Sequence, residues 1–414
     1  MSDRGRIIWL RKTMAAFGLL LFAITWRLWT PQTEFPQIPF FGWLVDVPGG
    51  VDWIALVGTF ISLTTILFTN DRWSKAATGL FLISTSLLVL LNQHRLQPWV
   101  YLLLVTSSLL MCLPYQICLM WLRRIVISIY LYSAISKLDY QFVFTVGDQM
   151  LDVLVGFVGW ELDGFSPWLR IALVLCLPIG ELLVAVLLLF RKTAPIAAWL
   201  AIGLHVSLLL VLGPLGLNHQ PSVLVWNVWF IVQAWLLFSA NAKNEITSTS
   251  SGAKPNQARS HSTEFVMAGQ WLAVFVISFP LTCAVSPWVE LPIKADHWIA
   301  WEVYAPRSSR ALEYPLLRDQ PWDVQRPSSI SANSRSLSTL GVPVYPQDRF
   351  QMACWMAWLE SQSNASGLNP VVLVSSTANR WTGQRLHTRI DGPVAVQKYR
   401  NQRWFNTRSR SITK

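Results

Sequence analysis

Nine apolar stretches, each long enough to cross a lipid bilayer, constrain this chain more than any other feature of its sequence. A transmembrane helix needs roughly 17–25 predominantly apolar residues. The composition agrees, because 13% of the residues are charged and 53% are hydrophobic, whereas about a quarter of the residues in soluble domains are charged. We therefore predict an α-helical polytopic membrane protein with about nine transmembrane helices, near residues 13–29, 52–69, 75–92, 98–114, 121–137, 168–190, 194–213, 220–239 and 266–287.

The apolar pattern also divides the chain into segments. Residues 1–240 form the predicted transmembrane body, and the polar, Ser- and Thr-rich residues 241–264 form a predicted flexible cytoplasmic linker. Residues 265–287 form the last predicted transmembrane helix. The remaining residues, 288–414, are polar, Arg-rich and Pro-rich, and we expect them to form a separate basic domain outside the membrane.

Three patterns predict a small α+β fold for this carboxy-terminal domain. The segments 298–306 and 370–377 are typical of strands, whereas the segment 348–362 places its apolar residues on one helical face. The short segment 150–159 cannot span a bilayer and contains Asp152, so we expect it to be re-entrant or interfacial.

The distribution of Lys and Arg predicts the orientation, because cytoplasmic loops retain these residues. Basic residues lie at the amino terminus and at four later positions that nine spans would place on the same side: 71–75, 123–124, 191–192 and 243–259. The loops 30–51 and 138–167 carry acids and no Lys or Arg. This pattern predicts a multi-pass protein of the cell membrane with a cytoplasmic amino terminus and an extracytoplasmic carboxy-terminal domain.

The net charge of +11 could suggest a nucleic-acid partner, but its distribution favours another explanation. Residues 288–414 contain 16 Lys/Arg and 9 Asp/Glu, so they contribute +7 of the total. No spacing typical of a nucleic-acid-binding module accompanies this charge. We expect the lipid bilayer, with its anionic headgroups, as the partner rather than a nucleic acid, and the sequence identifies no protein partner.

Several ionisable residues in or beside the apolar runs are candidates for chemistry, because charged groups in a bilayer are costly. Lys137 ends one apolar run and precedes Asp139, so it is either a snorkelling anchor paired with Asp139 or a lysine that loses its proton on burial and then acts as a general base. Glu181 and His205 lie in consecutive spans and can face each other; alternatively, each makes a structural hydrogen bond to a neighbouring helix.

Two further candidates, His94 and Arg95, precede the fourth span and are either part of a site or a solvated loop. No Cys or His spacing in the chain is typical of a metal site, so we predict none.

Three motifs in residues 90–240 resemble the HTTM (horizontally transferred transmembrane) family, which includes the vitamin K-dependent gamma-carboxylases. They are SAISKLDYQFVFTVG, IGELLVAVLLLF and GLHVSLLLVLGPLGL, and NQHRLQPW resembles the loop before the family's later helices. The resemblance implies a quinone or hydroquinone as cofactor, Lys137 as the catalytic base and His205 as a catalytic supporting residue. It leaves Asp139, Glu181, His94 and Arg95 as supporting candidates.

The chain also departs from that family. The carboxylases carry a large lumenal portion, whereas residues 288–414 are much shorter and show no match to it, and a shared membrane body does not transfer a reaction. Three functions therefore remain open: a carboxylase-like or quinone-linked enzyme that holds a lipid-soluble molecule, a non-catalytic scaffold that anchors the exported domain, and a DoxX- or MauE-like redox-associated membrane protein. Transport is less favoured, because no inverted pair of broken helices is evident.

Overall fold

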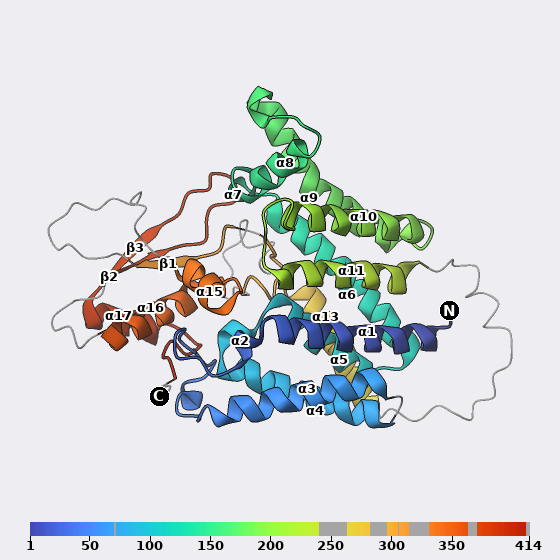
Figure 1. Ribbon diagram of the computed structural model, residues 1–414, viewed down its shortest axis with the longest axis horizontal. Coiled ribbons are helices and arrows are strands. Elements are labelled where there is room, and N and C mark those ends of the chain that lie inside the picture. Colours follow the sequence, from blue (N-terminus) through green and yellow to red (C-terminus); the bar gives the residue numbers. More distant parts are fainter. Residues whose placement is uncertain are drawn as a thin grey trace.

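The protein consists of an elongated bundle of apolar helices with a small domain at one end (Figure 1). The computed structural model describes residues 1–69, 72–239, 263–281, 296–304, 306–313, 331–362 and 371–410. The predicted linker therefore lies almost entirely outside the described residues, and so does the end of the last predicted span.

Among the residues that the structure describes, seven helices are long and apolar enough to cross a membrane. They are α1 (Asp3–Ile24), α3 (Gly50–Phe68), α4 (Arg72–Leu91), α6 (Tyr115–Lys137), α9 (Pro167–Leu189), α10 (Ala194–Leu212) and α11 (Pro221–Phe238). The predicted membrane class is confirmed at this level: the chain is an integral membrane protein.

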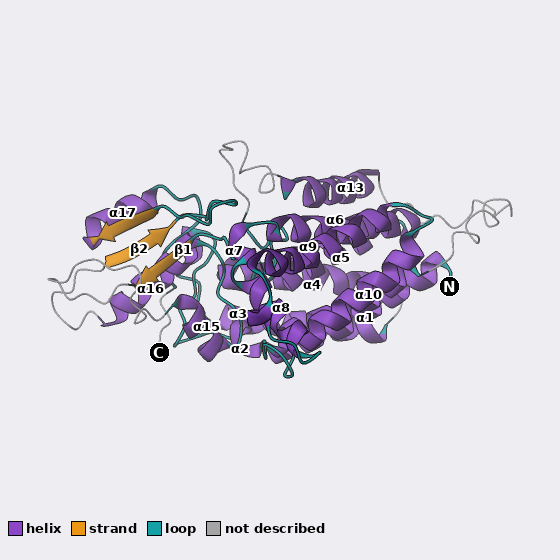
Figure 2. Cartoon of the chain, turned by 90° about the horizontal axis from the view of Figure 1, so that it is seen from above, coloured by secondary structure: helices purple, strands orange, loops and turns teal. Residues whose placement is uncertain are grey.

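The predicted count of nine is wrong by the criterion of length. The fourth and ninth apolar stretches form α5 (Pro98–Cys112, 15 residues) and α13 (Thr263–Ser278, 16 residues), which are shorter than the other seven. Leu113 and Pro114 end the first of these early, because Pro114 cannot continue a helix and instead becomes the N-cap of α6. Figure 2 shows α13 on the outside of the bundle, beside α5 and α6.

Short elements connect the long helices at the end of the bundle that faces the small domain. They are α2 (Trp26–Trp29), the 3₁₀ turns η1 (Gly42–Leu44), η2 (Gln93–Arg95) and η3 (Leu162–Gly164), α7 (Tyr140–Val143) and α8 (Val146–Gly156). The 11-residue α8 is too short to span a bilayer, and it projects from the side of the bundle in Figure 1. Several long helices begin at proline, whose fixed φ suits the first helical turn.

The small domain is an α+β unit around a three-stranded antiparallel sheet in the order β1 (Arg310–Glu313), β2 (Val371–Ser375), β3 (His387–Asp391). Its helices are α15 (Ala332–Leu340), α16 (Asp348–Gln362) and α17 (Gly392–Asn401). In the register, Leu373 on β2 faces Leu312 on one side and Arg389 on the other. The predictions of a helix over 348–362 and a strand within 370–377 are therefore confirmed.

The predicted strand over 298–306 is wrong. Its described residues form turns, and Trp301 and Tyr304 have φ values of 59° and 61°, in the left-handed region that no strand uses. Alternating apolar residues suggested a strand, but Trp301 and the neighbouring Ala300 are both buried, because the turns direct consecutive side chains inward.

The small domain and the helix bundle share one apolar core. Phe35, in the loop after α2, packs its ring 5.4 Å from Trp358 of α16, and Tyr101 of α5 packs 4.9 Å from Trp301. Backbone hydrogen bonds also join the two, for example from the amide of Tyr140 to the carbonyl of Arg380 at 2.7 Å. The domain is therefore fixed on the bundle by packing as well as by polar contacts.

Candidate functional site

A polar cluster inside the helix bundle begins with three side chains on one face of α6. Tyr130, Ser133 and Lys137 are spaced three and four residues apart, and this spacing places them one above another along the helix. Tyr130 and Ser133 are buried, and Lys137 is half-buried. The other members of the cluster come from α9, α10 and α11.

Lys137 forms an ion pair with Glu181 of α9. Its Nζ lies 2.6 Å from Glu181 Oε2 and 2.6 Å from Ser133 Oγ, and each charged side chain is only 12% exposed. The predicted alternative, in which Asp139 is the partner of Lys137, is not what the structure shows. An ion pair this shielded experiences a lower dielectric than water, so each charge depends on the other.

His205 lies in a second branch of the cluster, between Tyr130 and Asn227. The Nδ1 of His205 is 2.8 Å from Asn227 Oδ1, and its Nε2 is 2.8 Å from the Tyr130 hydroxyl. The amide nitrogen of Asn227 donates to the carbonyl of Val223, which orients Oδ1 toward the imidazole. His205 therefore donates through Nδ1 and accepts the Tyr130 proton at Nε2.

The two branches meet on α6, because Tyr130 and Lys137 lie on the same face of this helix. The ring of His205 is also stacked on Phe230 at 5.0 Å, which fixes its plane. The structure thus brings together Lys137, Glu181 and His205, three of the six residues that the sequence singled out.

Asp139 has a different role. Its carboxylate caps α7 by accepting a hydrogen bond of 2.8 Å from the amide of Phe142. Burial raises the pKa of Asp139, and this effect exceeds the opposing influence of that hydrogen bond and of Arg307 and Arg380. Asp139 therefore supports the junction between α6 and the small domain.

His94 and Arg95 also lie at this junction rather than in the bundle. His94 Nε2 is 2.9 Å from the carbonyl of Pro343, and its ring packs between Phe35 and Phe350. Burial lowers the pKa of His94 to about 4, so the imidazole is neutral at pH 7. The predicted alternative of a solvated loop is wrong, because His94 and Arg95 are 0% exposed.

The Arg95 guanidinium is held by Asp52 of α3 and by backbone carbonyls. It donates to the Asp52 carboxylate, to Leu28 at 2.9 Å and to Trp29 at 3.0 Å. Arg410, near the end of the chain, forms a second ion pair with Asp52 at 2.8 Å. Asp52 thus joins two arginines that are about 300 residues apart in sequence.

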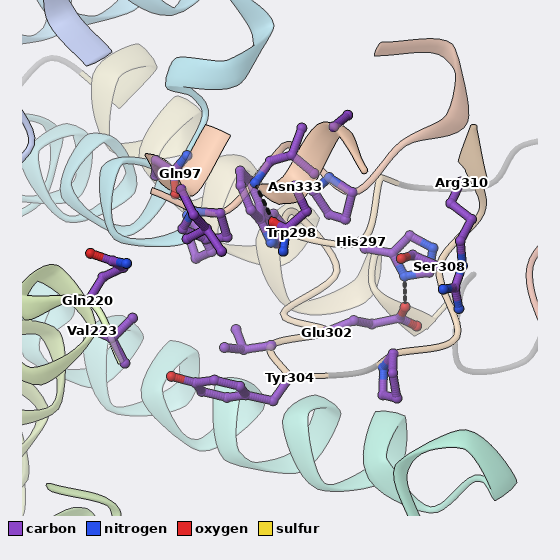
Figure 3. A pocket seen from close by; sticks show the side chains of 18 of the residues that line it. Gln97, Gln220, Val223, His297, Trp298, Glu302, Tyr304, Ser308, Arg310 and Asn333 are labelled. Atoms are coloured by element: carbon purple, nitrogen blue, oxygen red, sulfur yellow. Dashed lines mark hydrogen bonds and ion pairs between the residues drawn. The ribbon is translucent and has the colours of Figure 1, made fainter. Parts of the chain in front are cut away.

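A cavity of about 560 Å³ lies between the small domain and the ends of α5 and α11. Figure 3 shows Gln97, Gln220 and Val223 at one end of it, and His297, Ser308 and Arg310 at the other. None of Lys137, Glu181 and His205 is among the described residues that line it. The cavity is therefore a second candidate site, separate from the cluster in the bundle.

A histidine–carboxylate pair lies in the cavity wall. His297 Nδ1 hydrogen-bonds to Glu302, and Arg307 approaches the other carboxylate oxygen at 3.4 Å. Although burial raises the pKa of Glu302, the charge and hydrogen bond of His297 outweigh it and lower the pKa to about 2. Sequence reasoning missed these residues because a His and a Glu in a polar segment carry no distinctive pattern.

Comparisons with known proteins give no further information on either site. No family model matches the chain, and no curated protein and no solved structure is found to be similar to it. Among the residues that the structure describes, no group of three or more His, Cys, Asp or Glu side chains could hold a metal ion.

Proposed function

We propose that this membrane protein is an enzyme that abstracts a proton from a lipid-soluble, hydroquinone-like substrate, with Lys137 as the base. One observation carries the proposal: the bundle contains a shielded Lys137–Glu181 pair beside the Tyr130–His205–Asn227 chain. Ionisable groups in a membrane body are costly to maintain and mark functional sites. The sequence resemblance to the HTTM family supports the same role for Lys137.

The Lys137–Glu181 pair gives a route to a neutral base. Transfer of one proton from Nζ to the Glu181 carboxylate, over 2.6 Å, converts the ion pair into an amine and a carboxylic acid. Low dielectric favours that neutral form, because separate charges are poorly solvated there. The amine then takes the proton of a substrate hydroxyl, which leaves the substrate oxyanion as the counter-charge of the Lys137 ammonium, while Glu181 remains a neutral carboxylic acid until it releases the proton that it accepted.

His205 positions the second branch. Because its Nδ1–H is committed to Asn227, its Nε2 accepts from Tyr130 and fixes the direction of that hydroxyl. The Tyr130 hydroxyl lies on the same helix face as Lys137, two turns away. In this proposal, His205 and Tyr130 shape the polar side of the substrate site, and Lys137 exchanges the proton.

The test begins with the purified full-length protein in nanodiscs. Mass spectrometry of the co-purified lipid should detect a bound quinone, and added short-chain ubiquinol should bind and ionise at a lower pH than it does free in lipid. Lys137→Ala and Lys137→Arg should both abolish that shift in ionisation, because a guanidinium stays protonated. Lys75→Ala, which removes an exposed lysine of α4, is the matched control. Absence of quinone and of ubiquinol binding would refute the proposal.

The scaffold function remains the second candidate, and a specific observation favours it. The small domain is fixed to the bundle by the buried Asp52, Arg95 and Arg410 ion pairs, as expected for a membrane body that presents an exported domain. The quinone-binding assay distinguishes the enzyme from the scaffold, because a scaffold binds no quinone and Lys137→Ala changes nothing that the assay measures.

A further inference from the structure

The cavity between the small domain and the bundle has the chemistry of a ligand site. Its volume of about 560 Å³ lies within the range of small-molecule pockets, roughly 300–1,000 Å³. Val223 of α11 lies at one end, with the lining residue Trp226 about one turn further along the same helix, and polar residues of the small domain lie at the other end (Figure 3). A ligand that fills the cavity therefore has an apolar part and a polar part.

The polar end carries a positive charge without a counter-ion. Arg310, at the start of β1, lines the cavity, and among the described residues its guanidinium has no carboxylate partner. Glu302 is the one carboxylate among the described lining residues, and it is already hydrogen-bonded to His297 and Arg307. The net electrostatic character of this end favours an anion.

Two polar atoms without a protein partner among the described residues belong to residues that line the cavity. His297 is 8% exposed, and its Nδ1 is committed to Glu302, whereas Nε2 has no partner in the described part of the chain. Ser222, 5% exposed at the start of α11, likewise makes no hydrogen bond to any described residue through its hydroxyl. Both atoms are therefore free to form a hydrogen bond with a ligand in the cavity.

Helix ends reinforce the positive potential. The first residues of α5, α11 and α15 all line the cavity, and neither Gln97 nor Gln220 caps its helix with a side-chain hydrogen bond. The free amide groups of such helix starts attract negative charge. The membrane-side wall therefore tolerates an anionic ligand as well.

We propose that this cavity binds a phosphate-bearing amphiphile, with the phosphate against Arg310, His297 and Ser308 and the apolar chain against Val223 and Trp226. An Arg guanidinium suits a phosphate because its donors match two phosphate oxygens. His297 can meet the phosphate through Nε2, because its Nδ1 is already hydrogen-bonded to Glu302. This site is independent of the proton chemistry proposed for Lys137.

The test compares three probes on the full-length protein in detergent: dioctanoyl phosphatidic acid, dioctanoylglycerol and glycerol 3-phosphate. Native mass spectrometry or a thermal shift gives the apparent Kd of each. We expect phosphatidic acid to bind at least about tenfold more tightly than dioctanoylglycerol, which has the same chains and no phosphate. If glycerol 3-phosphate competes with equal affinity, the phosphate site stands and its ligand is a soluble phosphate ester rather than a lipid.

Variants distinguish this cavity from general lipid binding. Arg310→Gln should weaken phosphatidic acid binding at least about tenfold, whereas Arg389→Gln, on β3 and 48% exposed beside Asp391, should leave it unchanged. Should Arg310→Gln fail to fold, Val223→Trp fills the membrane end of the cavity without changing any charge and should also weaken binding. Equal binding of phosphatidic acid and dioctanoylglycerol, or equal affinities in Val223→Trp, Arg310→Gln and wild type, would overturn the proposal.

Discussion

At the scale of single residues, the Lys137–Glu181 pair should be costly to break. Removing one member of a buried ion pair leaves an uncompensated charge, at a typical cost of about 3–5 kcal/mol; with each side chain 12% exposed, we expect the lower end of that range. Glu181→Gln and Lys137→Met should each lower the unfolding free energy in detergent, and the double variant should cost less than their sum.

The control for these single and double variants is the Arg170–Asp148 pair, whose side chains are 36% and 26% exposed. Breaking it with Arg170→Gln should change stability little, because solvent and salt screen exposed pairs. Strict additivity of Glu181→Gln and Lys137→Met would show that the two side chains do not interact in the folded protein.

His94 predicts a pH dependence in the attachment of the small domain. The folded imidazole has a pKa of about 4, against 6.5 when it is exposed, so the unfolded state binds a proton that the folded state does not. The contribution of His94 to the free energy of unfolding is fully present above pH 6.5. It decreases as the pH falls toward 4, by at most about 1.4 kcal/mol per pH unit.

His94→Gln tests this dependence because the amide can still donate to the carbonyl of Pro343 but does not titrate. Melting temperatures measured from pH 7 to pH 4.5 should fall less steeply in this variant than in wild type. Parallel profiles would assign the acid sensitivity to other groups.

The sequence identified the ionisable members of the site but not their neutral partners. Lys137, Glu181 and His205 interrupt apolar runs, so their cost in a bilayer made them visible. Tyr130 and Asn227 did not stand out, because hydroxyl and amide residues are common at helix contacts. Which of these side chains contact one another depends on how the four helices are rotated about their axes. No local sequence pattern predicts that rotation.

At the scale of elements, apolar length predicted where helices lie, but not how close they pack. Gly269 of α13 is one place where two helices pack closely: a Cβ placed on it would lie 2.9 Å from the Cβ of Cys112, the last residue of α5, and 2.9 Å from the side chain of Leu113, which follows it. Small residues allow membrane helices to approach closely. The sequence showed a glycine in an apolar run, and only the fold shows what it touches.

Gly269→Val should therefore separate α13 from α5 and destabilise the protein by about 1–3 kcal/mol, the usual cost of overpacking. Gly203→Val on α10 is the matched control, because no atom lies within 4 Å of a Cβ at that position. Thermal unfolding in detergent measures both. Equal melting temperatures for the two variants would contradict the close packing of α13.

At the scale of the whole molecule, Asp52 connects the start of α3 to the end of the chain. Its carboxylate is 0% exposed and pairs with Arg95 and Arg410. Asp52→Asn leaves two buried guanidinium groups without a counter-charge, so we expect a loss of about 3–5 kcal/mol. Protease digestion should then release the small domain at lower denaturant concentrations than in wild type, whereas Asp46→Asn, at a nearby exposed site, should not change its release.

Membrane topology is the property on which helix length and loop charge make different predictions. Seven crossings by the long helices and nine crossings that include α5 and α13 both place the two chain ends on opposite sides. They differ at Arg191 and Lys192, between α9 and α10, which nine crossings place on the side of the amino terminus and seven crossings on the other side.

The basic loops all fall on one side only if the short helices α5 and α13 also cross. The 15 residues of α5 reach about 22 Å at 1.5 Å per residue, short of the roughly 30 Å of a bilayer core. Most of this helix is buried among its neighbours, so little of its length has to match lipid. Reporter fusions after Lys12, Arg191 and Lys414 should be cytoplasmic, cytoplasmic and external, respectively, and an external Arg191 fusion would show that α5 does not cross.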